Sequence, residues 1–320
     1  MNIAVLEGYV NNPGDLSWDA LESYGTVTVY DRTPRDQLAQ RMADVDVAVS
    51  SKTVWDAEAL GWAPRLKMIA LTSTGYNVVD LDAARARGIV VSNVPAYSTP
   101  DVAQMTFALL LELCLHVGEH SRLVMDGDWT RAKDFSFWST PLVELAGKTM
   151  GIVGMGSIGQ AVGRIARAFG MPVVFENRSP KPQLEGDGVR QAGLDELLAT
   201  ADVVSLHVPA TPETEHMMDA AALAKMKDGS YLLNTARGSL VDEQAVVDAL
   251  RSGKLAGFGA DVVSVEPMRP DNPLLQAKGE NIVVTPHIAW ATHEARERLL
   301  ATVAANVGAF VDGRPQNVVD

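Results

Sequence analysis

The sequence predicts an α/β fold built from two doubly wound parallel-sheet lobes, and three observations support this prediction. Short β-branched and aliphatic runs alternate with helical stretches along the chain. These runs are apolar on both faces, as in parallel strands that helices cover on both sides. The chain has 320 residues, enough for roughly two domains that each bury a core of their own.

The expected strands fall into an early group and a late group. The early strands are Asn2–Leu6, Val27–Tyr30, Val45–Ser50, Leu66–Leu71 and Ile89–Ser92. The late strands are Thr149–Val153, Val173–Asn177, Asp202–Val208, Ser230–Asn234, Gly257–Val262 and Asn281–Thr285. Helical stretches separate the strands, so each group is expected to form one parallel sheet.

Two predicted helices divide the chain into domains. Thr99 is typical of an N-cap, with Pro100 at the first position of a helix that runs to about His116. A helix over Thr292–Val311 follows the last strand and can return to the first lobe. We therefore expect a split first domain, residues 1–99 plus 288–320, with an inserted domain over residues 100–287.

The composition indicates a protein of a reducing, aqueous compartment without a nucleic-acid partner. The formal net charge is −13, whereas sequence-independent nucleic-acid binding needs a basic surface. The single cysteine, Cys114, excludes an internal disulfide and is expected to be a buried apolar side chain. Residues Met1–Leu6 do not resemble a signal peptide, and the most apolar helix, Ala103–Leu115, is too short to span a bilayer. We expect a cytoplasmic protein without a membrane partner.

A glycine motif, Gly154–Gly159, lies between a predicted strand and a predicted helix, Ser157–Phe169, and reads GMGSIG. Gly154 allows a tight turn, Gly156 lets the backbone approach a pyrophosphate, and Gly159 lets helix and strand pack closely. The start of the helix offers free N–H groups and a partial positive charge to the phosphates. This context of strand, turn and helix predicts a dinucleotide site.

Polar segments follow three strands of the late group: Asn234–Gly238, Asp261–Pro267 and Thr285–Trp290. Open α/β sheets bind ligands at the carboxyl ends of their strands, which allows Arg237, Glu266 and His287 to come together. Hydride transfer to a 2-keto acid requires groups that bind the carboxylate, polarise the carbonyl and deliver a proton. Arg237 suits the first two tasks through its planar charged fork. His287 suits the third because imidazole titrates near physiological pH, and Glu266 would orient the ring and hold its proton more tightly.

Each of these three residues also has an ordinary structural interpretation. A single histidine after a strand is more often structural than catalytic, and single arginines or loop glutamates are usually surface charges. Their occurrence together behind a dinucleotide motif favours catalysis. The residues therefore predict a nicotinamide-dependent dehydrogenase that acts on small 2-keto acids or runs the reverse reaction.

Several segments also resemble a known family: Thr74–Asp80, Asn93–Pro95, Leu145–Thr149, Gly154–Gly159, Leu206–Pro209, Thr235–Gly238 and Pro286–Ala289. Through them the chain resembles the D-isomer-specific 2-hydroxyacid dehydrogenases over nearly its whole length. A finer likeness, to glycerate dehydrogenases or hydroxypyruvate reductases, is carried by Tyr76–Asn77, Leu110–Leu113 and Phe135–Trp138. Hydroxypyruvate and glyoxylate are therefore the favoured substrates, and D-2-hydroxy acids are the expected products.

The resemblance implies a fold and a set of catalytic roles. It implies a flavodoxin-like substrate domain with an inserted Rossmann dinucleotide-binding domain, and an active site in the cleft. Arg237 would anchor the substrate, His287 would be the acid/base, and Glu266 would be its partner. The substrate carboxylate would be held by backbone N–H groups of one loop: Ser73, Thr74 and Gly75.

The resemblance also implies cofactor contacts and an assembly. Besides the glycines, the cofactor residues would be Ser157, Ile158, His207, Pro209, Thr214, Thr235, Ala236, Asp261 and His287. Asp261 would meet the nicotinamide carboxamide. The family is dimeric, so a homodimer is expected, with the long helix from Pro100 in the interface. Trp138 is either a buried interface aromatic or a wall of the substrate pocket.

The end of the second late strand bears on the choice between NAD and NADP. An enzyme that prefers NAD usually presents a carboxylate there to the ribose 2′-OH. Matching the chain to the family places Asn177 at that position. Arg178 and Ser179 follow at once, and Lys181 adds positive charge nearby. Arginine accommodates a 2′-phosphate, and alternation along the strand points Glu176 to the opposite face. The sequence therefore favours NADP over NAD.

Two alternative functions remain open. One is another dehydrogenase of this fold, such as a formate dehydrogenase, in which the histidine's partner is a glutamine rather than a glutamate such as Glu266. The other is a non-catalytic, NAD-sensing binding protein, although such proteins carry extra tails for partners. Metal catalysis is not expected, because His116 and His120 have helical spacing but not the H-E-x-x-H pattern.

Overall fold

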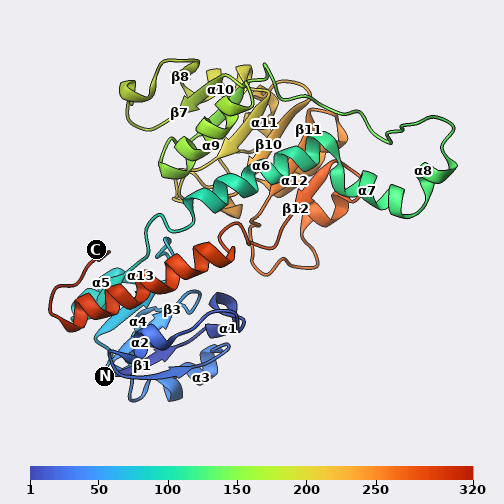
Figure 1. Cartoon of the computed structure of the whole chain (residues 1–320). Coiled ribbons are helices and arrows are strands. Elements are labelled where there is room, and N and C mark those ends of the chain that lie inside the picture. Colours follow the sequence, from blue (N-terminus) through green and yellow to red (C-terminus); the bar gives the residue numbers. More distant parts are fainter. Residues whose placement is uncertain (320) are drawn as a thin grey trace. The chain divides into compact units, whose positions relative to one another are not determined.

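The chain folds into two compact units, and the computed structural model describes residues 1–319 (Figure 1). Unit 1 consists of Met1–Ser98 together with Ala291–Asp320, and unit 2 consists of Thr99–Trp290. Each unit is built around one sheet in which all the strands are parallel. The α/β class expected from the alternation of apolar runs and helical stretches is confirmed.

Unit 1 contains a five-stranded sheet with the order β2-β1-β3-β4-β5, which is the flavodoxin-like order. Its strands are β1 (Asn2–Val5), β2 (Thr26–Val29), β3 (Val47–Ser50), β4 (Met68–Leu71) and β5 (Val90–Ser92). Its helices are α1 (Gly8–Asn11), α2 (Asp19–Glu22), α3 (Arg35–Met42), α4 (Ala57–Gly61), α5 (Leu81–Ala86) and α13 (His293–Val311). Alternate strand residues, among them Ala4 and Ile69, share a core with Leu38 and Trp55. Helix α13 packs against β4 and α2.

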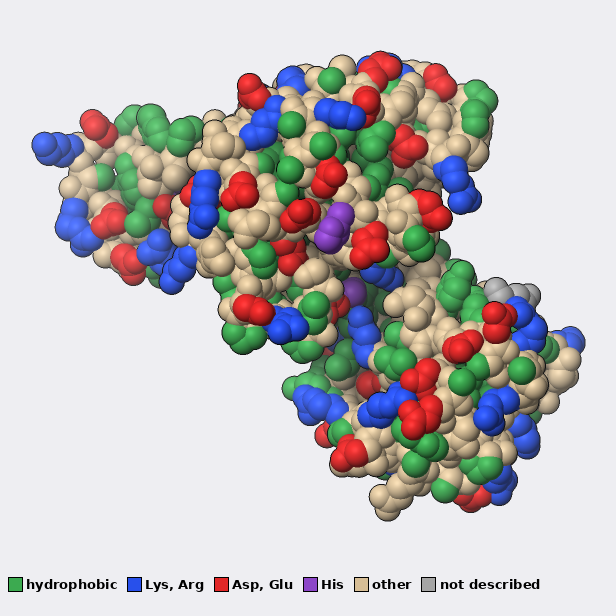
Figure 2. All heavy atoms as spheres, turned by 180° about the vertical axis from the view of Figure 1, so that it is seen from behind, with side chains coloured by type: hydrophobic (Ala, Val, Ile, Leu, Met, Phe, Trp, Pro, Cys, Tyr) green, Lys and Arg blue, Asp and Glu red, His purple; other side chains and the backbone are tan. Residues whose placement is uncertain are grey.

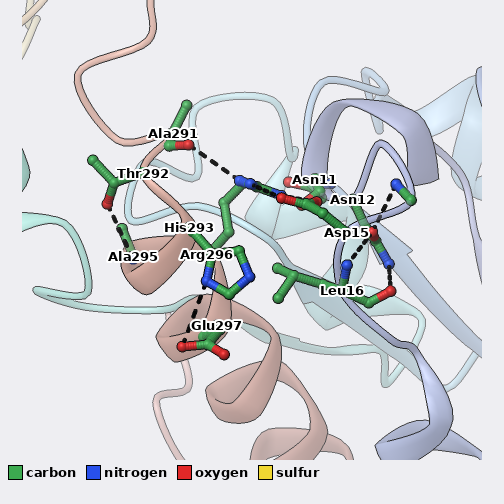
Figure 3. Close-up of polar contacts among 11 residues, drawn as sticks. Asn11, Asn12, Asp15, Leu16, Ala291, Thr292, His293, Ala295, Arg296 and Glu297 are labelled. Atoms are coloured by element: carbon green, nitrogen blue, oxygen red, sulfur yellow. Dashed lines mark hydrogen bonds and ion pairs between the residues drawn. The ribbon is translucent and has the colours of Figure 1, made fainter.

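The first turn of α13 is anchored to the loop that follows α1 (Figure 3). Thr292, expected as the first residue of this helix, is its cap and accepts the N–H of Ala295 at 3.2 Å. Arg296 forms a two-pronged ion pair with Asp15, with N–O distances of 2.7 and 2.5 Å. The Nε of Arg296 also donates to the carbonyl of Ala291 at 3.1 Å, which ties the start of the segment to its own helix.

Unit 2 contains a seven-stranded sheet with the order β12-β11-β10-β9-β6-β7-β8. Its strands are β6 (Met150–Val153), β7 (Val173–Glu176), β8 (Val189–Gln191), β9 (Val203–Leu206), β10 (Ser230–Asn234), β11 (Leu255–Ala260) and β12 (Ile282–Val284). Its α-helices are α6 (Thr99–Leu115), α7 (Val117–Met125), α8 (Asp128–Arg131), α9 (Ser157–Ala168), α10 (Leu194–Thr200), α11 (Ala220–Lys225) and α12 (Glu243–Arg251). Short 3-10 turns are η1 (Pro182–Leu184), η2 (Gly238–Leu240) and η3 (Pro273–Ala277).

Two apolar cores lie on the two faces of the unit 2 sheet. Along β6, Ile152 belongs to one core and Val153 to the other, because neighbouring strand residues point to opposite faces. Residues of α6 and α9 fill the first core, and residues of α10, α11 and α12 fill the second. Cys114 is buried in the first core, where burial raises the pKa of its thiol to about 11. The sheet is thus covered on both faces by helices.

The long helix α6 ends close to its expected bound and differs from the prediction at its start. It begins at Thr99 itself instead of being capped by it, and Pro100 is tolerated because first-turn N–H groups have no helical partner. It ends at Leu115, because His116 adopts a left-handed conformation with φ 48°.

No helix among the described residues could cross a membrane alone. By length and composition only the pair α6 and α7, bent by 58°, would pass as a span.

The strands were located correctly by their apolar runs, with errors at their ends and one omission. The strand expected over Asp202–Val208 ends at Leu206, which is the last residue paired with β6 and β10. Strand β8 was not expected, because its residues, Val189–Gln191, form a short polar edge without an apolar run. Strand ends depend on pairing with neighbours, which a local pattern does not report.

Candidate active site

The glycine turn after β6 packs closely at Gly154 and Gly159 and leaves the Gly156 backbone uncovered. Gly154 has φ +96°, and a Cβ there would lie 2.6 Å from the carbonyl oxygen of His207. A Cβ on Gly159 would lie 2.2 Å from the Gly154 carbonyl oxygen, so helix and turn pack without side chains. A Cβ on Gly156 would meet nothing within 4 Å, so the backbone there faces open space. Helix α9 starts at Ser157 and its unpaired first N–H groups can bind phosphate.

The strand order places this turn at the switch point of the sheet. The chain leaves β6 toward β7 on one side and returns to β9 on the other, and ligands bind outside the strand ends at such points. His207 follows β9 there, and its N–H donates to the Val153 carbonyl at 2.7 Å. Its Nε2 lies 2.9 Å from Ser205 Oγ, while the shielded Nδ1 has no partner among the described residues. Burial lowers the pKa of His207 to about 4, so a neutral ring with a spare nitrogen lies beside the turn.

The residue that joins the end of β7 to the glycine turn is Asn177. Its Oδ1 accepts the Met155 N–H at 3.2 Å, and its Nδ2 donates to the Ser179 carbonyl at 3.0 Å. Arg178 is exposed, whereas Glu176 is half-buried and burial raises its pKa. The side chain held against the turn is therefore an amide and not a carboxylate.

His287 and Glu266 form an ion pair in unit 2, with Nδ1 2.7 Å from Oε2. Their side chains are 27% and 29% exposed, so the pair is accessible to a small molecule. The His287 backbone is left-handed, with φ 55°, which is uncommon for a residue other than glycine. Its carbonyl accepts the Trp290 indole N–H at 2.8 Å, and its N–H donates to the Thr285 carbonyl at 3.0 Å. Within residues 1–319 Nε2 makes no hydrogen bond, which leaves it able to exchange a proton with a substrate.

The loop that carries His287 is fixed by the buried carboxylate of Asp261. Its Oδ1 accepts the Thr285 hydroxyl at 2.5 Å and the Ile288 N–H at 2.9 Å, and its Oδ2 accepts the Ala289 N–H at 2.7 Å. The residue is 1% exposed, and burial raises its pKa despite these bonds. These contacts are all within the protein, and the expected contact of Asp261 with a nicotinamide carboxamide stays a prediction.

Arg237 follows β10 in a half-buried position. Its guanidinium donates to the Ala236 carbonyl at 2.7 Å, and Asn234 brackets the turn by donating to the Arg237 carbonyl at 2.8 Å. A Cβ on Gly238 would lie 1.9 Å from the carbonyl carbon of Val263. The turn that carries Arg237 therefore packs directly on the loop that follows β11.

The structure thus pairs two of the three expected catalytic residues and places the third on an adjoining turn. No hydrogen bond in the described part of the chain joins Arg237 to either His287 or Glu266. This geometry can orient the imidazole and let it transfer a proton. The Glu266 carboxylate holds Nδ1 of the ring, and Nε2 stays available for proton transfer. The catalytic role of each residue stays a prediction.

The other expected cofactor residues lie at the same edge of the unit 2 sheet. Thr214 and Pro209 share the exposed loop after β9, where the Thr214 hydroxyl donates to the Pro209 carbonyl at 2.8 Å. Thr235 is 8% exposed and its hydroxyl lies 3.1 Å from that of Thr106. Ile158 packs partly on the core beside α9. Their contacts with a cofactor stay predictions.

The expected substrate residues belong to unit 1, where they follow β4. The Ser73 hydroxyl donates to the Gly75 carbonyl at 2.6 Å, and the Thr74 hydroxyl donates to the Val94 carbonyl at 2.7 Å. Asn93 also donates to the Thr74 carbonyl at 2.7 Å. One of these bonds lies within the loop and two tie it to the segment after β5, and its role in holding a substrate carboxylate stays a prediction.

Sequence reasoning missed Glu243, a buried residue of the site region that bonds to the loop after β11. An acidic residue in the first turn of a helix is ordinarily a response to the helix dipole. The position of Glu243 in the sequence is therefore explained without its long-range contacts, and the sequence carries no other signal for those contacts. Trp290 was likewise known only as part of a polar segment, although its indole fixes the His287 carbonyl.

Comparisons with known proteins show what the chain is similar to. Residues 107–289 match the family described as D-isomer specific 2-hydroxyacid dehydrogenase, NAD binding domain. The chain is 47% identical to a hydroxypyruvate reductase of Blautia hydrogenotrophica, with 100% of both chains covered. It is 39% identical to a glycerate dehydrogenase of Methylorubrum extorquens, covering 89% of this chain and 88% of the relative.

A solved structure extends the likeness to the whole fold. The NADPH-dependent glyoxylate/hydroxypyruvate reductase of Sinorhizobium meliloti superposes with a TM-score of 0.84 at 30% identity, and 99% of this chain and 97% of that chain are covered. The family match covers more than half of the chain, and the relatives span nearly all of it. The chain belongs to the D-isomer-specific 2-hydroxyacid dehydrogenase family.

Proposed function

We propose that this chain reduces hydroxypyruvate or glyoxylate to the D-2-hydroxy acid with a reduced nicotinamide dinucleotide. The observation that carries the proposal is the His287–Glu266 pair at 2.7 Å, in the unit that holds the glycine turn. The names of the relatives support the choice of substrate. In this proposal unit 2 is the dinucleotide-binding domain predicted over residues 100–287, and unit 1 is the substrate domain predicted over 1–99 plus 288–320.

The residues of the chain supply the acid–base chemistry. A reduced nicotinamide, when bound, supplies the hydride for the carbonyl carbon. His287 donates its Nε2 proton to the carbonyl oxygen, so that the keto group becomes a hydroxyl and the ring becomes neutral. Glu266 orients the ring through Nδ1 and stabilises its protonated form. Arg237 binds the substrate carboxylate and polarises the carbonyl through its planar fork.

A substrate screen with hydroxypyruvate, glyoxylate and pyruvate, followed by nicotinamide absorbance, tests this proposal. Turnover should be found with hydroxypyruvate or glyoxylate, and formate should give none in the oxidative direction. Arg237→Lys should lower kcat/KM for the keto acid, because an ammonium cannot make the forked contact. Cofactor binding without turnover of any 2-keto acid would instead identify a nicotinamide-sensing protein.

The proposed cofactor is NADPH rather than NADH. The amide of Asn177 lies against the glycine turn, where a carboxylate would repel a 2′-phosphate. Arg178 is the next residue and is exposed, so its guanidinium can bind such a phosphate. The half-buried Glu176 is the competing carboxylate, and burial favours its uncharged form by raising its pKa.

The kcat/KM values for NADPH and NADH in the wild type and in Arg178→Ala decide the cofactor. Arg178→Ala should lose efficiency selectively with NADPH. Arg190→Ala is the matched control, because this exposed arginine lies on neighbouring β8 and pairs with Glu196 at 2.6 Å. A wild type that strongly prefers NADH would identify Glu176 as the ribose ligand.

The proposed assembly is a homodimer through the arm of unit 2, residues 117–143. Hydrophobic side chains gather on this segment, which projects at the left of Figure 2. Its exposed residues are Val117, Met125, Trp129, Phe135, Trp138 and Leu142. Phe135 is 91% and Trp138 67% exposed, and such a patch on a folded chain marks a contact surface. A second copy of the chain is the proposed occupant. The family resemblance implies a dimer but places the helix from Pro100, and not this arm, in its interface.

Sedimentation equilibrium of the wild type and of Phe135→Ser with Trp138→Ser tests the assembly. The wild type should have the mass of a dimer and the double variant the mass of a monomer. Val54→Ser, which changes an exposed hydrophobic residue of unit 1, is the control and should leave the mass unchanged. A monomeric wild type at micromolar concentration would contradict the proposal.

A further inference from the structure

Glu243 is a buried carboxylate of unit 2 that takes no part in the proposed reaction. It is the first residue of α12 and is 9% exposed. Its neighbour Asp242 already caps the helix, because the Asp242 side chain accepts the N–H groups of Gln244 and Ala245. A carboxylate is costly to bury unless it is hydrogen-bonded, so the partners of Glu243 indicate what it does.

Those partners all lie in the loop that follows β11. Oε1 accepts the Ser264 N–H at 2.8 Å, and Oε2 accepts the Ser264 hydroxyl at 2.7 Å. Oε2 also accepts the Asn272 side-chain N–H at 2.9 Å, and Asn272 in turn accepts the Leu274 N–H at 2.9 Å. One carboxylate therefore ties together both ends of the segment 264–272, most of which is exposed.

The same segment carries Glu266, two residues beyond the anchored Ser264. The peptide between Val263 and Ser264 is confined from the other side by Gly238, where a Cβ would lie 1.9 Å from the Val263 carbonyl carbon. The N–H of Val263, which belongs to the preceding peptide, donates to Glu266 Oε1 at 3.4 Å, so Val263 is also joined directly to the Glu266 carboxylate. Glu243 and Gly238 thus hold the base of the turn that presents Glu266 to the imidazole.

We propose that Glu243 is a positioning residue, which fixes the Ser264 end of this loop so that Glu266 meets His287 Nδ1 at 2.7 Å. The inference rests on the proposed function of the His287–Glu266 pair. Two titratable groups of unit 2 act on the imidazole from the loops packed around it. They are Glu266, through the ion pair, and Asp261, through its electrostatic interaction.

The test is the NMR titration of the His287 ring in cofactor-free protein, with its signal assigned from its loss in His287→Ala. In Glu243→Ala the ring should titrate at lower pH than in the wild type, because a less firmly held carboxylate stabilises the imidazolium less. Glu266→Gln should shift the titration further in the same direction. The pH limit of keto-acid reduction should move with the ring in each variant.

The double variant Glu243→Ala with Glu266→Gln separates positioning from direct charge. If Glu243 acts through Glu266, the double variant should titrate where Glu266→Gln does, whereas a direct electrostatic effect would add to it. Asp242→Ala is the matched control: it removes the cap of the same helix and should lower the melting temperature without moving the titration. Ser264→Ala, which removes one of the three bonds and no charge, should give a smaller shift in the same direction.

An unchanged titration in a folded Glu243→Ala, or additive shifts in the double variant, overturns the inference. If Glu243→Ala does not fold, Ser264→Ala and Glu243→Gln decide by the same criterion. Failure of the proposed function has a different signature, near-normal turnover by His287→Ala, which does not depend on Glu243.

Discussion

Two cation–carboxylate pairs, whose cations lie close together in the sequence, differ in what they can do. In unit 2, His287 meets Glu266, and both side chains are more than a quarter exposed. In unit 1, Arg296 meets Asp15, and the arginine side chain is 9% exposed (Figure 3). The first pair uses one nitrogen of its cation, whereas the second uses two nitrogens of the guanidinium, whose third nitrogen donates to the Ala291 carbonyl.

The difference follows from the chemistry of the two cations. Arginine keeps its proton at any physiological pH and binds a carboxylate with a rigid fork, so Arg296 suits a permanent anchor for the start of α13. Imidazole gains and loses a proton near neutrality, and one ring nitrogen of His287 has no protein partner within residues 1–319. We therefore expect the His287–Glu266 pair to affect the rate of the reaction and the Arg296–Asp15 pair to affect the stability of the fold.

The largest expected effect is the loss of turnover in His287→Ala. Its kcat should fall by about 10²–10⁴, the usual contribution of a positioned general acid. The dissociation constant for NADPH, measured by fluorescence, and the melting temperature should stay close to the wild-type values. Near-normal turnover would show that His287 is not the acid.

Glu266→Gln should change the pH dependence of reduction. Reduction needs protonated His287, and a glutamine stabilises the imidazolium less than a carboxylate 2.7 Å away. The pH above which kcat/KM for the keto acid declines should therefore fall. An unchanged profile would mean that Glu266 does not act on the ring in solution.

Arg296→Met should affect stability and leave the chemistry intact. The substitution removes the ion pair with Asp15 and the bond to the Ala291 carbonyl, so the melting temperature should fall by several degrees. The kcat of the folded variant should stay near the wild-type value. Glu297→Ala is the control, because its partner His293 is 3.8 Å away and both are exposed, so this pair contributes little.

Asp15→Asn should give the smallest effect, and one that depends on pH. The Arg296 hydrogen bonds hold the pKa of Asp15 at about 2, below its ordinary value of 3.8. The stabilisation is therefore complete above about pH 4 and is lost as the pH falls toward 2. Melting temperatures of the wild type and Asp15→Asn should differ most at neutral pH and converge below pH 4. A constant difference would exclude the Asp15 charge as the cause.

Sequence patterns predicted the elements better than their ends or their distant contacts. Gly154–Gly159 was placed between strand and helix because the local order of residues defines that turn. Strand β8 was missed because Val189–Gln191 lacks an apolar run and becomes a strand only by pairing with β7. Helix α6 ends because the backbone of His116 is left-handed, and the residue types around His116 do not predict that conformation.

The sequence by itself determined the fold class, the family and the segments that hold the polar residues of the site. It could do so because apolar periodicity, glycine turns and family motifs are local along the chain. Only the tertiary structure decided that Glu266 lies 2.7 Å from His287, that Asp261 holds the loop of His287, and that Glu243 holds the loop of Glu266. Each of these contacts joins residues far apart in sequence, and the packing of strand ends sets their distance.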